Sequence, residues 1–204
     1  MATKEIQSWA YDEPIRSPFA LPQGILGRLA GRLMLWLNDP GELVTLIGKQ
    51  DSVLEAGCGP GGLLRHIEAE RICGIDPSPE MLRQAARHNR GRDVELRLGT
   101  AADTGCPDDS FDVVVSVNNV AMWPDLEAGI HELRRVTRPR GRLLIAWHSA
   151  TGRSAIARKN ALSEEKLGRI AHALGEPTQR HELTNLTVLE RRCPGSASPE
   201  YRRT

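Results

Sequence analysis

The sequence predicts an α/β fold: a Rossmann-like, doubly wound sheet of about seven strands, mostly parallel with an antiparallel C-terminal strand and with helices on both faces. Three observations predict it. Strand-like apolar runs and helical patterns alternate along the chain from residue 41 onward, which is typical of parallel sheets. A glycine-rich turn at 57–62 follows the first of these strands. Two short strand-like segments end the pattern near the C-terminus.

The strands are predicted from two kinds of pattern. Residues 112–117 form a largely apolar run, which is typical of a strand covered on both faces. Val94, Leu96 and Leu98 instead alternate with polar residues, as in a half-buried strand. In chain order, the predicted strands cover residues 52–55, 71–75, 94–98, 112–117, 142–147, 177–183 and 185–191.

Capping residues mark the predicted helices. Ser78 can cap a helix whose first residue is Pro79. Ser163 can cap another helix, and Gly175 lies just past its end. In chain order, the predicted helices cover residues 43–48, 61–70, 78–89, 126–136 and 163–174.

The first 40 residues are predicted to lie outside this alternation. Residues 1–23 contain Pro14, Pro18 and Pro22 and are expected to be irregular. Residues 24–38 carry leucine and isoleucine at helical spacing, so we expect an amphipathic helix that caps the domain. A lipid-facing helix is the alternative. The expected organisation is an N-terminal segment at 1–40, a ligand-binding domain at 41–192 and a flexible tail at 193–204.

Composition excludes several classes of protein. The net charge is +1, so nothing favours nucleic acid as a partner. The most apolar segment, 24–37, contains Arg28 and Arg32 and is too short and too charged to span a bilayer. No cysteine lies in a Cys-x-x-Cys pair, so we expect no metal site, no disulfide framework and free thiols in the cytoplasm. The cysteines are Cys58, Cys73, Cys106 and Cys193.

The turn after the first predicted strand carries the strongest chemical signal. Glu55 ends the strand, and Gly57, Gly59 and Gly62 follow it with the spacing G-x-G-x-x-G. Such glycines let a ligand lie against the main chain, and a helix starting here would direct free N–H groups toward an anionic group. Because Asp76 ends the next strand, the pattern predicts a nucleotide-like cofactor, and NAD fits the glycines as well as any other.

Glu55 argues against a dinucleotide, because an acid beside a pyrophosphate is unfavourable, whereas an amine-bearing ligand would pair with it. The chain resembles the small type-11 family of class I S-adenosylmethionine-dependent methyltransferases. The resemblance covers about residues 50–148, is specific for fold and cofactor, and says little about the substrate. Four stretches carry it: VLEAGCGPG at 53–61, GIDPSPEML at 74–82, FDVVVS at 111–116 and LRRVTRPRGRL at 133–143.

The resemblance implies S-adenosylmethionine as cofactor and S-adenosylhomocysteine as product, bound by the domain at 41–192. Glu55 would hold the ammonium group, directly or through water, and Asp76 would accept hydrogen bonds from both ribose hydroxyls. Pro77 and Met81 would pack on the adenine. The expected cofactor-binding residues are Glu55, Gly57, Cys58, Gly59, Gly61, Asp76, Pro77, Met81, Thr100, Ala101, Ala102, Val117 and Asn118.

The adenine edge departs from the family pattern. Many members place an acid at the position of Thr100 or Ala102, and here neither residue is acidic. We therefore expect backbone groups of Ala101 and Ala102, or the side chain of Asp103, to contact the ring. Residues 116–118 would line the methionine side through their backbone.

Methyl transfer is an in-line displacement at carbon, so positioning and exclusion of water can supply much of the rate without a base. If a base acts, His148 after the fifth strand of the alternation is the expected one. The connection at 149–162 is short for a lid, so we expect the N-terminal 40 residues to cover the acceptor. The residues expected to wall the acceptor pocket are Trp9, Phe19, Asn119, Met122, Trp123 and Trp147.

The sequence therefore predicts methyl transfer to O, N or S of a small-molecule acceptor. The alternative is a protein of this fold that binds the cofactor without methyl transfer, such as a scaffold or a cyclase. A third hypothesis, an NAD-dependent oxidoreductase, lacks a Tyr-x-x-x-Lys pair. The identity of the acceptor and the existence of a homodimer stay open.

Overall fold

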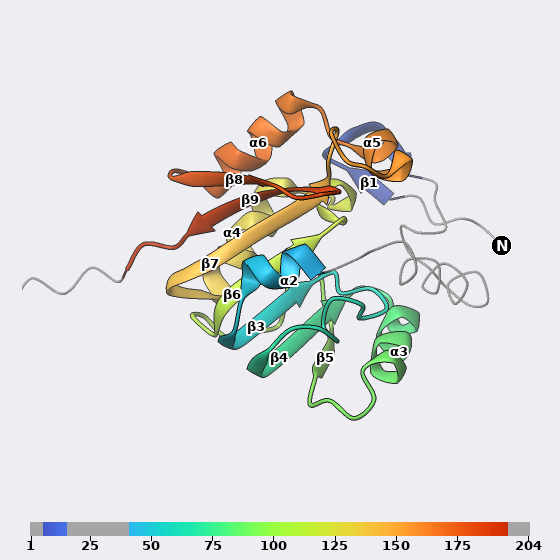
Figure 1. The fold of residues 1–204 in the computed structure, drawn as a ribbon. Coiled ribbons are helices and arrows are strands. Elements are labelled where there is room, and N and C mark those ends of the chain that lie inside the picture. The colour runs from blue at the N-terminus through green and yellow to red at the C-terminus, as the bar shows by residue number, and fades with distance from the viewer. Residues whose placement is uncertain (1–5, 16–40, 196–204) are drawn as a thin grey trace, which may run out of the picture.

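A seven-stranded sheet forms the centre of the computed structural model, which describes residues 6–15 and 41–195 (Figure 1). Its strand order is β5-β4-β3-β6-β7-β9-β8. The first five strands in this order run parallel, while β9 is antiparallel to β7 and to β8. The strands are β3 (Gln50–Ala56), β4 (Ala69–Asp76), β5 (Glu95–Leu98), β6 (Phe111–Val117), β7 (Thr137–His148), β8 (Thr178–Glu182) and β9 (Leu186–Arg192). The predicted fold class is confirmed.

Two hydrophobic clusters cover the two faces of the sheet. Val114 of β6 points into the cluster that contains α4 and α6, whereas its neighbours Val113 and Val115 point into the cluster that contains α2. Because successive side chains of a strand point to opposite faces, this explains why the consecutive residues 113–115 are all apolar. The helices are α2 (Gly41–Ile47), α3 (Pro79–His88), α4 (Leu126–Val136), α5 (Ala155–Asn160) and α6 (Glu164–Leu174), with a short 3₁₀ turn η1 (Val120–Met122). No helix among the described residues is long and apolar enough to cross a membrane.

The caps predicted from the sequence close their helices as expected. Ser78 accepts a hydrogen bond from the backbone N–H of Met81 at the start of α3, with Pro79 as the first helical residue. Ser163 caps α6 in the same way, and Gly175 ends that helix with a φ of 81°. These local signals fixed the helix ends because each satisfies a backbone group that the helix leaves free.

The helix predicted at 61–70 is wrong. Residues 62–66 form turns held by bonds such as His66 N–H to Leu63 O, and β4 already begins at Ala69. Gly61 has a φ of 79°, which a right-handed helix does not contain, and glycine is a poor helix former. Leu63 and Leu64 are still buried, so the apolar spacing correctly indicates burial, but turns and not a helix bury these side chains. The argument from a helix N-terminus at the glycine turn therefore does not apply.

The irregular segment predicted at 1–23 is wrong where the structure describes it. Strands β1 (Ile6–Ser8) and β2 (Tyr11–Ile15) form an antiparallel hairpin, and Pro14 lies in a strand of this two-stranded sheet, where proline is tolerated. The helix predicted at 24–38 lies outside the described residues. The connection at 149–162 contains α5, capped by Ser154, which the sequence analysis did not predict.

Cys193, the first residue of the predicted tail, is paired with the start of β7. Cys193 N–H donates to Gly141 O at 2.8 Å, and Arg140 N–H donates to Cys193 O at 3.1 Å. Backbone pairing with the start of β7 therefore continues one residue past β9. Residues 196–204 lie outside the described part of the chain.

A buried acid on α4 fixes the loop that follows β5. Glu132 Oε1 accepts hydrogen bonds from the backbone N–H of Thr104 at 2.9 Å and from its hydroxyl at 2.6 Å. The guanidinium of Arg135 donates to both oxygens of Glu132 and to Cys106 O. Hydrogen bonds from Arg135 and Thr104 lower the pKa of Glu132 from 4.5 to about 2.

Acid should weaken the fold through this residue. Because the pKa of Glu132 is lower in the folded state than in the unfolded chain, its contribution is complete above about pH 4.5 and is lost as the pH falls toward about 2. We expect Glu132→Gln to be less stable than the wild type at neutral pH and to show a smaller stability loss across that window. Urea unfolding at a series of pH values measures both, and parallel pH profiles for the two proteins would contradict the prediction.

Candidate functional site

The candidate site lies at the carboxyl ends of the parallel strands, where the strand order reverses. The chain passes from β3 to β4 and β5 on one side and then returns to β6 and β7 on the other. Ligands of open α/β sheets bind at such a reversal point. The predicted residues lie where three strands end: Glu55 and Gly57 at β3, Asp76 at β4 and Asn118 just after β6. The fold therefore brings them to one edge of the sheet.

The glycine turn is anchored to the end of β4. Gly57 N–H donates to Ile75 O at 2.8 Å, Cys58 N–H donates to the same oxygen at 2.9 Å, and Gly59 N–H donates to Asp76 Oδ2 at 2.9 Å. The Cys58 side chain is buried in the cluster that contains α2. Only the main chain of this turn is therefore available to a ligand at residue 58.

The three glycines at 57, 59 and 61 have positive φ values of 75°, 52° and 79°, but they have different surroundings. A Cβ at Gly57 would lie 2.2 Å from Asn119 Nδ2, and one at Gly61 would lie 2.5 Å from Asn89 Nδ2. A Cβ at Gly59 would meet no atom within 4 Å. Gly57 and Gly61 are therefore required by internal packing, whereas Gly59 leaves open space beside the main chain.

Glu55 is a buried acid with an unsatisfied oxygen. It is 4% exposed, and its Oε2 has no hydrogen-bond partner in the described parts of the chain, 6–15 and 41–195. Burial raises the pKa of Glu55 well above its usual value and the charge of Asp76 raises it further, although a backbone hydrogen bond from Leu64 lowers it. A buried acceptor of this kind is stabilised by a hydrogen-bond donor, and most by a cationic one. The residue therefore suits an ammonium group.

Asp76 is held in place by its neighbours. It is 7% exposed, its Oδ1 accepts from Ser78 N–H at 2.8 Å and its Oδ2 from Gly59 N–H. Burial raises the pKa of Asp76, and these two backbone bonds lower it. Each carboxylate oxygen can accept a second hydrogen bond, so the side chain is oriented and can still accept two hydroxyl groups.

The end of β6 supplies a second unsatisfied acceptor. Asn118 adopts a φ of 53°, its N–H donates to Ala146 O, and its buried Oδ1 has no partner among the described residues. The sequence predicts backbone contacts with the cofactor from this residue, and it leaves open whether the side chain closes the strand end or contacts a substrate. Nothing in the pattern predicts the positive φ. Val117 is half-buried and packs against the cluster that contains α2.

Asn119 does not present a free amide to an acceptor molecule. Its Oδ1 accepts from Ser116 Oγ and from Trp123 Nε1, both at 2.7 Å, and its Nδ2 donates to Ala56 O at 2.8 Å. The same Nδ2 lies 3.3 Å from Gly57 O. Asn119 therefore joins the ends of β3 and β6 and supports the glycine turn.

The residues expected around the adenine and its edge differ in exposure. Pro77 and Ala102 are exposed, whereas Met81 is 2% exposed and Ala101 is buried. Thr100 N–H donates to Asp103 O at 2.9 Å, and Asp103 N–H lies 3.1 Å from Thr100 Oγ1. This tight turn after β5 leaves Pro77 and Ala102 accessible, while the Met81 side chain is packed inside.

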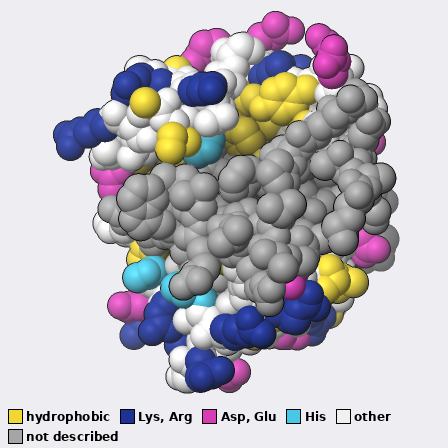
Figure 2. Space-filling view, turned by 90° about the vertical axis from the view of Figure 1, so that its right-hand side faces the viewer, with side chains coloured by type: hydrophobic (Ala, Val, Ile, Leu, Met, Phe, Trp, Pro, Cys, Tyr) yellow, Lys and Arg dark blue, Asp and Glu magenta, His cyan; other side chains and the backbone are white. Residues whose placement is uncertain are grey.

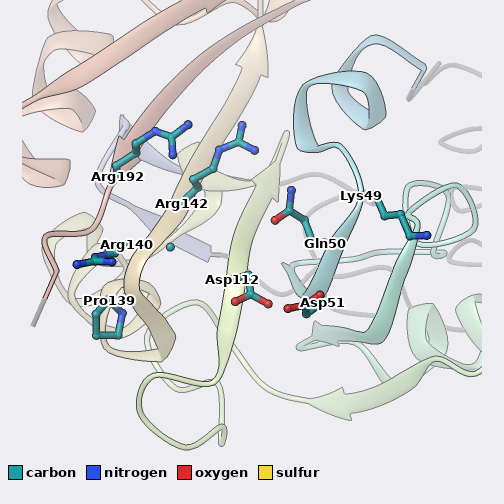
Figure 3. Close-up of a pocket in the computed structure, with 9 residues that line it drawn as sticks. Lys49, Gln50, Asp51, Asp112, Pro139, Arg140, Arg142 and Arg192 are labelled. Atoms are coloured by element: carbon teal, nitrogen blue, oxygen red, sulfur yellow. The ribbon is translucent and has the colours of Figure 1, made fainter.

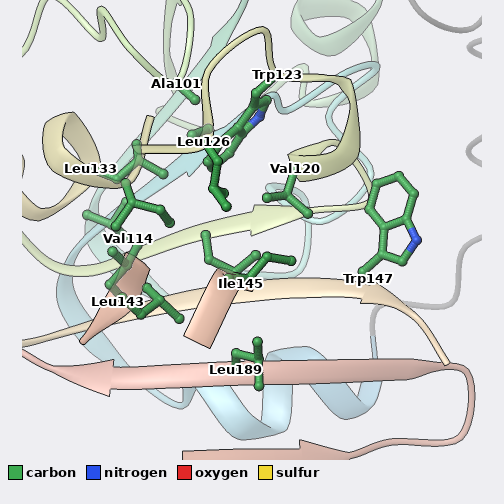
Figure 4. Close-up of a cluster of buried hydrophobic side chains, with 14 of the residues drawn as sticks. Ala101, Val114, Val120, Trp123, Leu126, Leu133, Leu143, Ile145, Trp147 and Leu189 are labelled. Atoms are coloured by element: carbon green, nitrogen blue, oxygen red, sulfur yellow. The ribbon is translucent and has the colours of Figure 1, made fainter. Parts of the chain in front are cut away.

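Two tryptophans expected to wall an acceptor pocket lie in the core. Trp123 is 7% and Trp147 is 4% exposed, and both belong to the hydrophobic cluster drawn in Figure 4. The indole N–H of Trp147 donates to Asn160 O at 2.7 Å. Met122 of η1 is half-buried, and Phe19 lies outside the described residues. The structure therefore assigns both indoles to packing.

The N-terminal hairpin docks on η1. Trp9 Nε1 donates to Val120 O at 2.7 Å, Trp9 N–H to Trp123 O at 3.2 Å, and Ser8 Oγ to Ala121 O at 2.5 Å. Trp9 is half-buried, with the guanidinium of Arg169 over its ring. Because η1 follows β6 directly, the hairpin lies beside the site edge.

His148 ends β7 at the same edge of the sheet. Burial lowers its pKa, so the imidazole is neutral near pH 7, which is the form that accepts a proton. Its ring contacts that of Trp147 edge-on, with centroids 5.7 Å apart.

Part of the chain is similar to known methyltransferases. A family model described as a methyltransferase domain matches residues 54–145. The uncharacterized methyltransferase YdaC of Bacillus subtilis is 36% identical over 103 residues, which are 48% of this chain and 57% of YdaC. The nocamycin O-methyltransferase of Saccharothrix syringae is 37% identical over 57% of this chain and 42% of its own length. The chain thus spans about half the length of these curated relatives.

A solved structure shows the same fold. The S-adenosylmethionine-dependent methyltransferase of Aquifex aeolicus superposes with a TM-score of 0.62, over 76% of this chain and 90% of its own, at 20% sequence identity. At this identity the similarity concerns the fold.

The glycines at 57 and 59 should respond differently to alanine. Gly57→Ala should lower the free energy of unfolding by about 2–5 kcal/mol, because the new methyl group overlaps Asn119 and φ stays positive. Gly59→Ala should lower it by only about 1–2 kcal/mol, since its Cβ has open space and only the backbone is strained. Urea unfolding of the two variants tests this, and equal losses would show that the turn is packed differently.

Proposed function

We propose that the protein transfers a methyl group from S-adenosylmethionine to O, N or S of a small-molecule acceptor. The match of residues 54–145 to a methyltransferase-domain family model supports this, as does the seven-stranded sheet. The observation that carries the proposal is that two of the buried acceptors without a partner among the described residues, Glu55 Oε2 and Asn118 Oδ1, lie at this edge of the sheet. Glu55 lies one residue before the end of β3, and Asn118 follows the neighbouring strand β6. The main chain at Gly59, just after β3, borders open space.

The described residues fit this cofactor group by group. Glu55 and Asn118 would accept hydrogen bonds from the ammonium, which would also stabilise the ionised form of Glu55. Asp76 would accept bonds from the ribose hydroxyls. The exposed Pro77 and the turn at 100–102 would contact the adenine, whose amino group finds only backbone acceptors or Asp103 there.

The cofactor supplies an activated methyl group, and the chain's own residues supply position and shelter. In the transfer, a lone pair of the acceptor forms a bond to the methyl carbon while the carbon–sulfur bond breaks and its electrons pass to sulfur. An acceptor O–H, N–H or S–H must then lose a proton. We propose that either His148 or water accepts this proton. The imidazole of His148 is neutral because burial lowers its pKa.

The docking of the hairpin supports the proposal that the N-terminal segment covers the acceptor site. Ser8 and Trp9 hold η1 through three backbone oxygens, so the N-terminal segment is fixed beside the strand that ends at Asn118. We propose that this segment, together with Met122, forms part of the acceptor pocket. We also propose that the protein is cytoplasmic, because its four cysteines are free thiols.

Calorimetry with S-adenosylmethionine, S-adenosylhomocysteine and NAD tests the cofactor. We expect the two sulfur nucleosides to bind and NAD not to bind, because Glu55 lies where a pyrophosphate would approach the glycine turn. Gly59→Ala should abolish this binding while the protein stays folded, since its Cβ occupies the open space beside the main chain. Tighter binding of NAD than of either nucleoside would overturn the proposal. Binding without turnover on a panel of acceptors would favour the scaffold or cyclase alternative.

Asp76 should control affinity through the ribose. Asp76→Ala should weaken S-adenosylhomocysteine binding by about 1.5–3 kcal/mol, the range for a hydrogen bond to a charged group. Asp93→Ala removes an exposed acid without a recorded partner and serves as the matched control. Because Asp76 also holds Gly59, the unfolding of both variants is measured in parallel. An unchanged dissociation constant for Asp76→Ala would exclude the ribose role.

A further inference from the structure

A groove of about 420 Å³ lies at the edge of the sheet opposite to the candidate cofactor site. It is formed where β3, β6 and β7 begin and where the antiparallel β9 ends (Figure 3). The arginines come from the β7 and β9 side, and the acids come from β3 and β6. The residues that line it are Lys49, Gln50, Asp51, Asp112, Pro139, Arg140, Gly141, Arg142 and Arg192.

Two of the charges that line the groove are already balanced. Arg142 forms an ion pair with the buried Glu190 at 2.7 Å and donates to the carbonyl of Ile47. Asp112 accepts from the guanidinium of Arg138 at 2.9 Å and from Ser52. These groups fix the walls and add little net charge to the cavity.

The remaining charges leave the groove positive. Lys49, Arg140 and Arg192 are exposed and form no recorded ion pair within the described residues, and Asp51 is the one acid of the lining that likewise has no recorded partner there. The lining therefore contains three cations and one carboxylate that form no ion pair among the described residues. A groove with this balance attracts an anion that carries more than one negative charge.

Arg140 lies in a backbone conformation that an arginine adopts at a cost. Its φ is 65°, in the region where residues with a Cβ are strained by about 1–2 kcal/mol, and its N–H is fixed by Cys193 O at 3.1 Å. A glycine would adopt this turn freely. A strained residue at a cavity wall points to a role for its side chain, and here that side chain is a guanidinium that forms no hydrogen bond or ion pair with residues 6–15 or 41–195.

We propose that this groove binds a small phosphate-type oxyanion, either free or as the terminal phosphate of a small metabolite, held by Arg140 and Arg192 with Lys49 across the opening. Guanidinium groups bind phosphate oxygens through paired, charge-assisted hydrogen bonds. The small volume and the net charge of +1 for the whole chain favour a small ligand over nucleic acid, whose binding usually needs an extended basic surface. The ligand would bind far from the glycine turn, so this site is independent of the methyl-transfer proposal.

Calorimetric titration of the full chain with inorganic pyrophosphate, without divalent metal and at constant chloride concentration, tests the site. Arg140→Gly and Arg192→Gln should each weaken binding by about tenfold, the scale of one charge-assisted hydrogen bond. Arg140→Gly relieves the strained φ, so its melting temperature should equal or exceed that of the wild type, and lost binding would not reflect unfolding. Arg90→Gln removes an equal charge from an exposed position after α3 and should leave the affinity unchanged.

Three results would overturn the inference: no binding of pyrophosphate to the wild type, an equal effect of Arg90→Gln, or a single-stranded oligonucleotide that binds more tightly than pyrophosphate through the same arginines. Binding of inorganic phosphate as well would identify the free ion as a sufficient ligand, and binding of pyrophosphate and a sugar phosphate only would identify an organic phosphate. S-adenosylhomocysteine binding should be unchanged in Arg140→Gly, which separates this test from that of the cofactor site.

Discussion

The side-chain amide of Asn119 connects the parts on which the candidate site depends. It donates to the main chain of Ala56 and Gly57 at the end of β3 and accepts the indole N–H of Trp123 beyond β6. Any side chain at residue 57 would overlap this amide, so glycine is required there for packing. The hairpin joins the same cluster because Trp9 donates to the backbone of Trp123. One amide thus links the end of β3 and the glycine turn to the segment that follows β6.

Next to this amide lie buried polar groups that have no hydrogen-bond partner among the described residues. Burial raises the pKa of both Glu55 and Asp76, and Oε2 of Glu55 and Oδ1 of Asn118 have no partner among the described residues. Buried acceptors without donors destabilise a protein, and a ligand rich in donors would satisfy both of these. The opposite edge has the reverse chemistry, because Arg140 and Arg192 form no ion pair within the part of the chain that the structure describes.

The structure differs from the sequence-based expectations where the same residue pattern is compatible with two backbone conformations. Leu63, Leu64 and Ile67 have helical spacing, yet Gly61 adopts a positive φ and the stretch forms turns. The hairpin at 6–15 was missed because its strands are short and Pro14 reads as a break, although a two-stranded sheet tolerates it. Local spacing records which residues are buried, and it does not record which backbone geometry buries them.

The sequence alone determined the alternation of strands and helices, the caps, the carboxylates at the strand ends and the glycine turn, because each depends on neighbours within a few residues. Only the tertiary structure decided what the side chains around the site do. It packed Trp123 and Trp147 into the core, bound the amide of Asn119 and left Oδ1 of Asn118 without a partner among the described residues. These outcomes depend on contacts between residues far apart in the chain, such as Asn119 with Gly57, which no local pattern encodes.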